Sequence, residues 1–234
     1  MNDYTLSSDS FSKAFLEVDQ RGWGKIDLQK HPPILNGSKL YNLMDKGYDS
    51  GKRGMYYNEI AFNWFNEWVE AGGIQSYHDL ETSKSIFDVS AAKEIYTKIF
   101  GDKLAKDLLD LISQIKELCI EHHPDKYNRN LKLGRVLLRQ MNEHETTNHS
   151  GSEWHEDTGY SNKPFFQYLS AAITLHGKPT LAEKYSPEVG QLLIFNNYHR
   201  RIDLKLSDDF AFKHKGPKSG PKLFLFFEFL IPQK

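Results

Sequence analysis

The side chains with the clearest capacity for chemistry lie in the segment His155-Glu156-Asp157. In an extended strand, residues i and i+2 point to the same side, so the His155 imidazole and the Asp157 carboxylate can bind one ion while Glu156 faces elsewhere. An imidazole and a carboxylate together suit a divalent transition metal, and one more protein ligand would complete the set. The spacing therefore predicts that His155 and Asp157 are metal ligands, and that a third ligand comes from elsewhere in the chain.

Two downstream histidines are candidates for the third ligand. His199 follows the apolar run 191–195 by only four residues, which leaves little room for further strands between it and His155. His214 lies farther along and stands eight residues before Lys222, a separation that fits two strands joined as a hairpin. We therefore favour His214 and keep His199 as the alternative.

The elements that must position these residues change in character along the chain. Apolar residues recur at helical spacing over residues 57–72, 91–100 and 103–121, which predicts amphipathic helices. From about residue 133 the pattern becomes extended, with short runs rich in Val, Ile, Leu, Phe and Tyr separated by Gly, Pro, Asn and Ser. The strands expected from these runs cover residues 135–141, 168–175, 191–195, 202–206, 209–214 and 223–230.

This order predicts an α+β protein in which helices pack on a β-sandwich or barrel. We expect residues 1–132 to form a helical support region and residues 133–234 to form the catalytic core, the two making one integrated domain. A chain of 234 residues is long enough to bury a sizeable core, and its single cysteine, Cys119, excludes a disulfide framework.

The order of motifs resembles the Fe(II)/2-oxoglutarate-dependent dioxygenase family over about residues 133–230. In that family an H-x-D motif is followed by a G-x-L-L-x-F strand, here residues 190–195, then by a distal His and a basic residue that opens the last strand. The resemblance implies a double-stranded β-helix (jelly-roll or cupin-like) core under the helical N-terminal half. It also implies that His155, Asp157 and His214 bind Fe(II), with 2-oxoglutarate and O2 as co-substrates and no catalytic side chain beyond the metal ligands.

The same resemblance assigns Lys222 to the far carboxylate of 2-oxoglutarate. A dicarboxylate in a mostly apolar barrel needs a fixed cation, and a lysine in place of the commoner arginine pairs through one point instead of two. Lys213, Lys215 and Lys218 are alternatives for this role.

The substrate is predicted more coarsely, as a small molecule such as an amino acid or an amine that is hydroxylated. Arg139 lies in a strand expected to feed the pocket, and Thr180 lies in a nearby turn; with Glu153 they are the candidate substrate-binding residues. Acidic residues gather around the metal motif, which fits either a solvated acidic loop or a site for a cationic substrate; they are Glu143, Glu145, Glu153 and Glu156.

Composition limits the other classes of function. Lys plus Arg number 30 against 31 Asp plus Glu, so no global charge draws the chain to nucleic acid. No apolar run is long enough to span a bilayer, and the N-terminus lacks a signal-peptide pattern, so a cytoplasmic protein without membrane partners is expected. The alternatives left open are a non-catalytic cupin-like binding module, a hydrolase or isomerase that uses Zn or Mn, and a protein side-chain hydroxylase.

Overall fold

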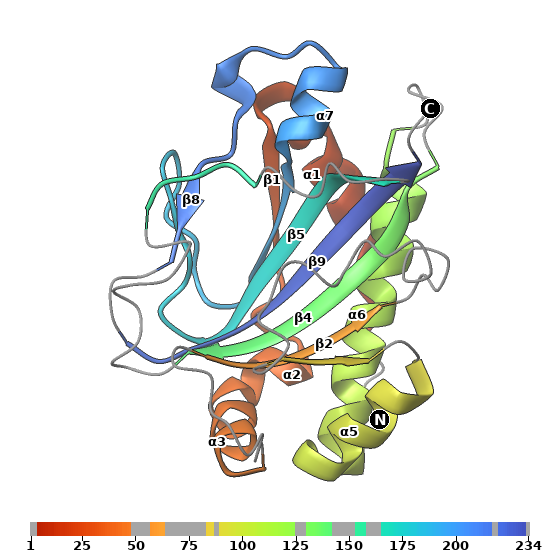
Figure 1. The fold of residues 1–234 in the computed structure, drawn as a ribbon, viewed down its shortest axis with the longest axis vertical. Helices are drawn as coiled ribbons and strands as arrows, with labels where there is room; N and C mark the ends of the chain where they lie inside the picture. Colours follow the sequence, from red (N-terminus) through yellow and green to blue (C-terminus); the bar gives the residue numbers. More distant parts are fainter. Residues whose placement is uncertain are drawn as a thin grey trace.

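A seven-stranded sheet forms the centre of the computed structural model, which describes residues 4–47, 57–63, 83–86, 89–124, 130–141, 153–157, 165–216 and 220–232. The strand order is β1-β7-β5-β9-β4-β2-β3, and every pair is antiparallel except β2 with β3 (Figure 1). The strands are β1 (Trp23–Asp27), β2 (Tyr57–Asn63), β3 (Ser83–Ile86), β4 (Lys132–Met141), β5 (Phe165–Gly177), β7 (Gln191–Asn196) and β9 (Lys222–Pro232).

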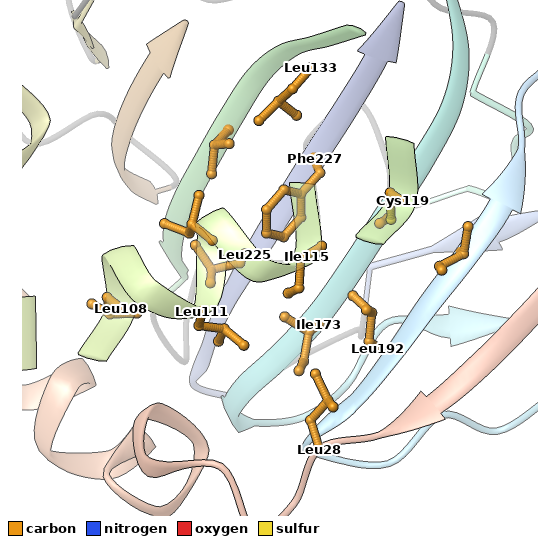
Figure 2. Close-up of a cluster of buried hydrophobic side chains, with 14 of the residues drawn as sticks. Leu28, Leu108, Leu111, Ile115, Cys119, Leu133, Ile173, Leu192, Leu225 and Phe227 are labelled. Atoms are coloured by element: carbon orange, nitrogen blue, oxygen red, sulfur yellow. The ribbon is translucent and has the colours of Figure 1, made fainter. Parts of the chain in front are cut away.

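Helices cover one face of this sheet. The described helices are α1 (Ser8–Arg21), α2 (Pro32–Leu35), α3 (Gly37–Gly47), α5 (Val89–Phe100), α6 (Asp102–His122) and α7 (Tyr198–Asp203). The apolar stripe of α6, which includes Leu108, Leu111, Ile115 and Cys119, packs against strand side chains such as Phe227 (Figure 2). Burying each such aliphatic side chain contributes roughly 1.5–3 kcal/mol to the stability of the fold. The side chains between the helices and this face of the sheet therefore form the main core.

The other face of the sheet carries the polar groups, because side chains alternate along each strand. On β9, Leu223, Leu225, Phe227 and Phe229 belong to the helix-facing core. Lys222, Phe224, Phe226 and Glu228 alternate with them and therefore point to the opposite face. A second apolar cluster lies on that face, formed by Trp23, Leu193, Phe195 and Phe212.

A small second sheet joins β6 (Leu181–Ala182) to β8 (His214–Lys215) in antiparallel register. His155 extends it through an isolated antiparallel bridge to His214. Ala182 and Tyr185, in and just after β6, pack against the second apolar cluster, which places this small sheet over the face that the helices leave open. The chain therefore presents His155 and His214 above the polar face of the large sheet.

Most elements expected from the sequence are confirmed, and three are wrong. Residues 57–63 form β2, which pairs along its whole length with β4, so strand pairing overrides the helical spacing there; residues 64–72 lie outside the described residues. Residues 202–206 alternate apolar and polar side chains as a strand does, yet they form the end of α7 and a turn in which Lys205 has a φ of 53°. Of residues 209–214, expected as one strand, only His214 belongs to a strand, after a 3₁₀ turn at Asp208–Phe210.

The N-terminal region is less exclusively helical than its sequence predicts. β1, β2 and β3 all precede residue 133, and they lie in the same sheet as the strands that follow it. Among the described residues, no helix combines the length and the apolar character that crossing a membrane requires.

Candidate metal centre

His155 and His214 face each other across an antiparallel bridge. The His155 N–H donates to the His214 carbonyl at 3.0 Å, and the His214 N–H donates back to the His155 carbonyl at 2.9 Å. Residues that exchange both backbone bonds are directly opposed, and their side chains lie on the same side of the sheet. The two imidazole centroids are accordingly 4.5 Å apart.

Asp157 completes the cluster from two residues farther along the same segment. Its Oδ1 lies 3.8 Å from His155 Nε2 and 3.6 Å from His214 Nε2. These separations are too long for hydrogen bonds, but two ligand atoms that each lie about 2.1 Å from one ion can be up to about 4.2 Å apart. One ligand atom from each of the three residues lies within 4.8 Å of the others. The structure thus brings together the three residues that the sequence predicts as ligands.

Backbone carbonyls fix which ring nitrogens face the cluster. His155 Nδ1 lies 2.8 Å from the Glu153 carbonyl oxygen, and His214 Nδ1 lies 3.5 Å from the Phe212 carbonyl oxygen. A carbonyl can only accept, so each Nδ1 donates its proton, and a neutral ring then has its lone pair on Nε2. Both Nε2 atoms are the ones directed toward Asp157, which is the orientation that metal binding needs.

The surroundings favour a neutral His214. Burial lowers the pKa of the His214 imidazole; the Asp157 carboxylate opposes this shift, while His155 and Lys222 reinforce it. Phe195 and Phe212 pack around the ring, with centroids 5.5 and 5.8 Å from it. The apolar wall explains the burial, and a lowered pKa keeps the imidazole available as a ligand at neutral pH.

One buried oxygen supports a cation at this position. Asp157 Oδ2 is buried and has no hydrogen-bond partner among the residues that the structure describes, and a buried carboxylate oxygen without a partner is costly. A divalent ion held by His155, Asp157 and His214 would balance the negative charge of this half-buried carboxylate, and two imidazoles with one carboxylate on one side of the ion form the ligand set of non-haem Fe(II) oxygenases. The residues present therefore fit the metal that the sequence resemblance implies.

Lys222 lies buried at the start of β9, on the same face of the sheet. Its Nζ donates to Thr180 Oγ1 at 2.5 Å and lies 4.2 Å from the centroid of Phe224. Burial, together with the nearby Arg139 guanidinium, lowers the pKa of Lys222 to about 7. The Arg139 guanidinium carbon lies 5.8 Å from the centroid of the same Phe224 ring, so two cationic groups share this part of the polar face of the sheet.

Backbone geometry brings Lys222 to this position. Gly177 is paired with Lys222 at the end of β5 and has a φ of +80°. A Cβ added to Gly177 would lie 1.8 Å from the Pro221 carbonyl oxygen, so any side chain there would push β9 away. Gly177 therefore permits the close approach that seats Lys222 beside Thr180.

The other sequence candidates lie elsewhere. His199 is in α7 and is not part of the three-residue cluster. Lys213 is exposed, Lys215 packs its Nζ 4.4 Å from the centroid of Trp154, and Lys218 lies outside the described residues. Glu153 is exposed and contributes its carbonyl, not its carboxylate, to His155. Glu143 and Glu145 lie outside the described residues.

The sequence missed the residues that hold the metal-binding segment in place. In the sequence, Glu156 is grouped with three other acidic residues near the metal motif. In the structure Glu156 is paired with Arg201 of α7 through two hydrogen bonds of 3.0 Å. The neighbouring Arg200 is fully buried. The pair of consecutive arginines, Arg200 and Arg201, was a sign in the sequence, but no local spacing relates it to Glu156.

Comparison with known proteins finds solved structures with a similar fold but no curated protein with a similar sequence. Neither a protein-family model nor a curated protein sequence matches this chain. Among solved structures, the rice dioxygenase for auxin oxidation aligns with a TM-score of 0.50 at 7% identity, covering 94% of this chain and 77% of the rice chain.

Two further solved structures align less closely. A Pseudomonas putida prolyl-4-hydroxylase aligns at 10% identity over 96% of this chain and 99% of its own, with a TM-score of 0.48. An oxidoreductase of the 2OG-Fe(II) oxygenase family from Burkholderia pseudomallei aligns at 9% identity over 98% and 92%, with a TM-score of 0.45.

At such identities the likeness concerns the fold alone. The α+β architecture, with N-terminal helices and antiparallel sheets, matches the double-stranded β-helix fold of the Fe(II)/2-oxoglutarate oxygenases. The chain combines this fold with a His-Asp-His cluster, so the resemblance inferred from its motifs is confirmed at the level of the fold.

Proposed function

We propose that this protein is an Fe(II)- and 2-oxoglutarate-dependent oxygenase that hydroxylates a small molecule such as an amino acid or an amine. The observation that carries the proposal is the cluster of His155, Asp157 and His214, whose ligand atoms lie within 4.8 Å of one another. It combines the ligand types of a non-haem iron site with a fold that matches the oxygenases.

In this proposal the side chains of the protein bind and orient 2-oxoglutarate, and they keep water away from the metal ligands. We assign Lys222 to the far carboxylate of 2-oxoglutarate; its contact with Thr180 and the second positive charge of the nearby Arg139 support this assignment. Phe195 and Phe212 pack against the His214 ring and shield this metal ligand from solvent. Iron with 2-oxoglutarate and O2 would supply the oxidising chemistry, which side chains alone cannot provide.

The acidic residues near the site support a cationic substrate less than the sequence suggests. Glu156 is neutralised by Arg201, so among the described acidic residues of this group only Glu153 stays exposed to meet an amine. The amine part of the proposal therefore depends on Glu153.

The test begins without oxygen. Fe(II) and then 2-oxoglutarate are added to metal-free protein, and the visible charge-transfer band of a chelated keto acid is recorded for the wild type and for His155→Ala, His214→Ala and His199→Ala. We expect the band in the wild type and in His199→Ala, and its loss in the other two variants. Succinate formation in air with amino acids and amines then identifies substrates.

Other outcomes lead to other functions. Metal binding without dependence on 2-oxoglutarate would indicate a hydrolase or isomerase that uses another ion, and no metal binding by folded protein would leave a binding module. Loss of the band in His199→Ala but not in His214→Ala would move the third ligand.

A further inference from the structure

Glu156, the residue between the metal ligands His155 and Asp157, forms a buried ion pair with Arg201 of α7. Arg201 Nε donates to Glu156 Oε1 and Arg201 Nη2 donates to Glu156 Oε2, each at 3.0 Å. The two side chains are only 9% and 10% exposed. This fork-to-fork arrangement fixes both the position and the orientation of a carboxylate, and Glu156 is flanked directly by His155 and Asp157.

The same helix also holds the backbone of Asp157. The Tyr198 N–H, at the start of α7, donates to the Asp157 carbonyl at 3.1 Å. Tyr198 and Arg201 are three residues apart and so lie on neighbouring positions of one helix face. One face of α7 therefore holds two consecutive residues of the metal-binding segment.

α7 is itself tied to the scaffold. Arg200 is fully buried, and its Nη2 donates to Asp19 of α1 at 2.9 Å. Its Nη1 bonds to Asn196 Oδ1 at the end of β7. A continuous set of polar contacts thus runs from α1 and β7, through α7, to the segment that carries His155 and Asp157.

We infer that Arg201 is a positioning residue of the metal centre, which it orders through Glu156. The inference rests on the proposed function in one respect only, namely that His155, Asp157 and His214 bind a divalent metal. Without Arg201 the Glu156 carboxylate would be buried without its cation, and the segment would lose its two-point attachment. Groups that orient metal ligands in this way typically contribute about 10–100-fold to metal affinity.

Cobalt binding to the 234-residue protein tests the role of Arg201. Co(II) is titrated into metal-free protein and followed by its visible absorption for the wild type, Arg201→Met, Arg201→Lys and Glu156→Gln. Arg21→Met is the matched control, because Arg21 also pairs with a carboxylate, Glu17 at 2.9 Å, but lies on α1. Thermal unfolding of each metal-free protein shows that binding is measured well below its unfolding temperature.

We expect Arg201→Met to weaken Co(II) binding at least about tenfold. Arg201→Lys should weaken it less, because the charge stays while the fork is lost. Glu156→Gln should also weaken it, and Arg21→Met should bind like the wild type. If Arg201→Met does not fold, Arg201→Lys and Glu156→Gln decide the question in the same way.

Two results would overturn the inference, and they are distinguishable. Wild-type affinity in the Arg201 and Glu156 variants, while wild-type protein binds Co(II), would show that the ion pair stabilises the fold without ordering the ligands, and would leave the proposed function intact. Failure of the wild type itself to bind Co(II) would remove both the inference and the proposed function.

Discussion

Burial gives Lys222 a charge that depends on pH near neutrality. Its pKa is lowered to about 7, first by loss of solvent and then by Arg139, so below pH 7 it is an ammonium and above pH 7 it becomes a neutral amine. A carboxylate binds the ammonium. The affinity for 2-oxoglutarate should therefore be highest below pH 7 and should fall by up to roughly tenfold per pH unit above it.

Anaerobic calorimetry on Fe(II)-loaded protein between pH 6 and 9 measures this dependence. Lys222→Arg is the control, because a guanidinium stays charged over the whole range and its profile should be flat. Parallel profiles for wild type and Lys222→Arg would mean that another group sets the pH dependence.

At this scale the sequence predicts the three residues of the metal cluster and misses the contact that holds Glu156. The i, i+2 spacing places His155 and Asp157 together and turns Glu156 away from them. The partner of Glu156 is Arg201, 45 residues away, and no local spacing relates the two. The role of Lys222 as the 2-oxoglutarate anchor stays a prediction.

The pairing of β4 with β9 places a buried ion pair on the polar face of the large sheet. Arg135 and Glu228 are directly opposed in register and are joined by bonds of 2.8 and 2.5 Å, with side chains only 4% and 6% exposed. Removing one partner of a buried pair leaves an uncompensated charge, which costs about 3–5 kcal/mol. Arg135→Met and Glu228→Gln should each lower the free energy of unfolding by about this amount.

Urea unfolding of the two single variants and of the double variant Arg135→Met/Glu228→Gln tests the assignment. The double variant should lose less than the sum of the two single losses, because no unpaired charge remains. Lys106→Met, which breaks a pair whose side chains are 74% and 49% exposed, should stay within about 0.5 kcal/mol of wild type. Additive losses in the double variant would contradict a coupled pair.

Elements differ in how well their sequence predicts them, and length explains much of the difference. α6 has 21 residues and repeats its apolar stripe over several turns, so its period is unambiguous. α7 has six residues, and Ile202 and Leu204 imitate strand alternation over that short span. β2 is defined by its partners β3 and β4, and such long-range pairing leaves a weak local signal.

Considered as a whole molecule, the protein has a main core that is separate from its candidate metal centre. None of His155, Asp157 and His214 belongs to the helix-facing core, so we expect metal-free protein to fold. A metal that binds only the folded state should then stabilise it, by about 2.7 kcal/mol at a free Co(II) concentration 100 times the Kd.

Urea unfolding with Co(II) and with a chelator measures this difference. His155→Ala should fold but gain little from Co(II), because it lacks one ligand. Equal stabilisation of the wild type and His155→Ala would place the bound ion elsewhere.

The α+β class follows from composition and periodicity alone, since each half of the chain has a dominant pattern. The membership of β1 and β2 in the large sheet does not follow, because each pairs with a strand far along the chain. The division of the chain at residue 133 stays a prediction.

The position of β9 in the sheet has a consequence for synthesis. β9 is the last described strand along the chain, yet it lies between β5 and β4 near the middle of the sheet (Figure 1). Until residues 220–232 leave the ribosome, the strands already made can form only two separate groups, β1-β7-β5 and β4-β2-β3, each with an open edge. The nascent chain therefore exposes the edges of β5 and β4 that β9 later covers, in addition to the permanent edges at β1 and β3. A chaperone would protect the chain from aggregation during this interval.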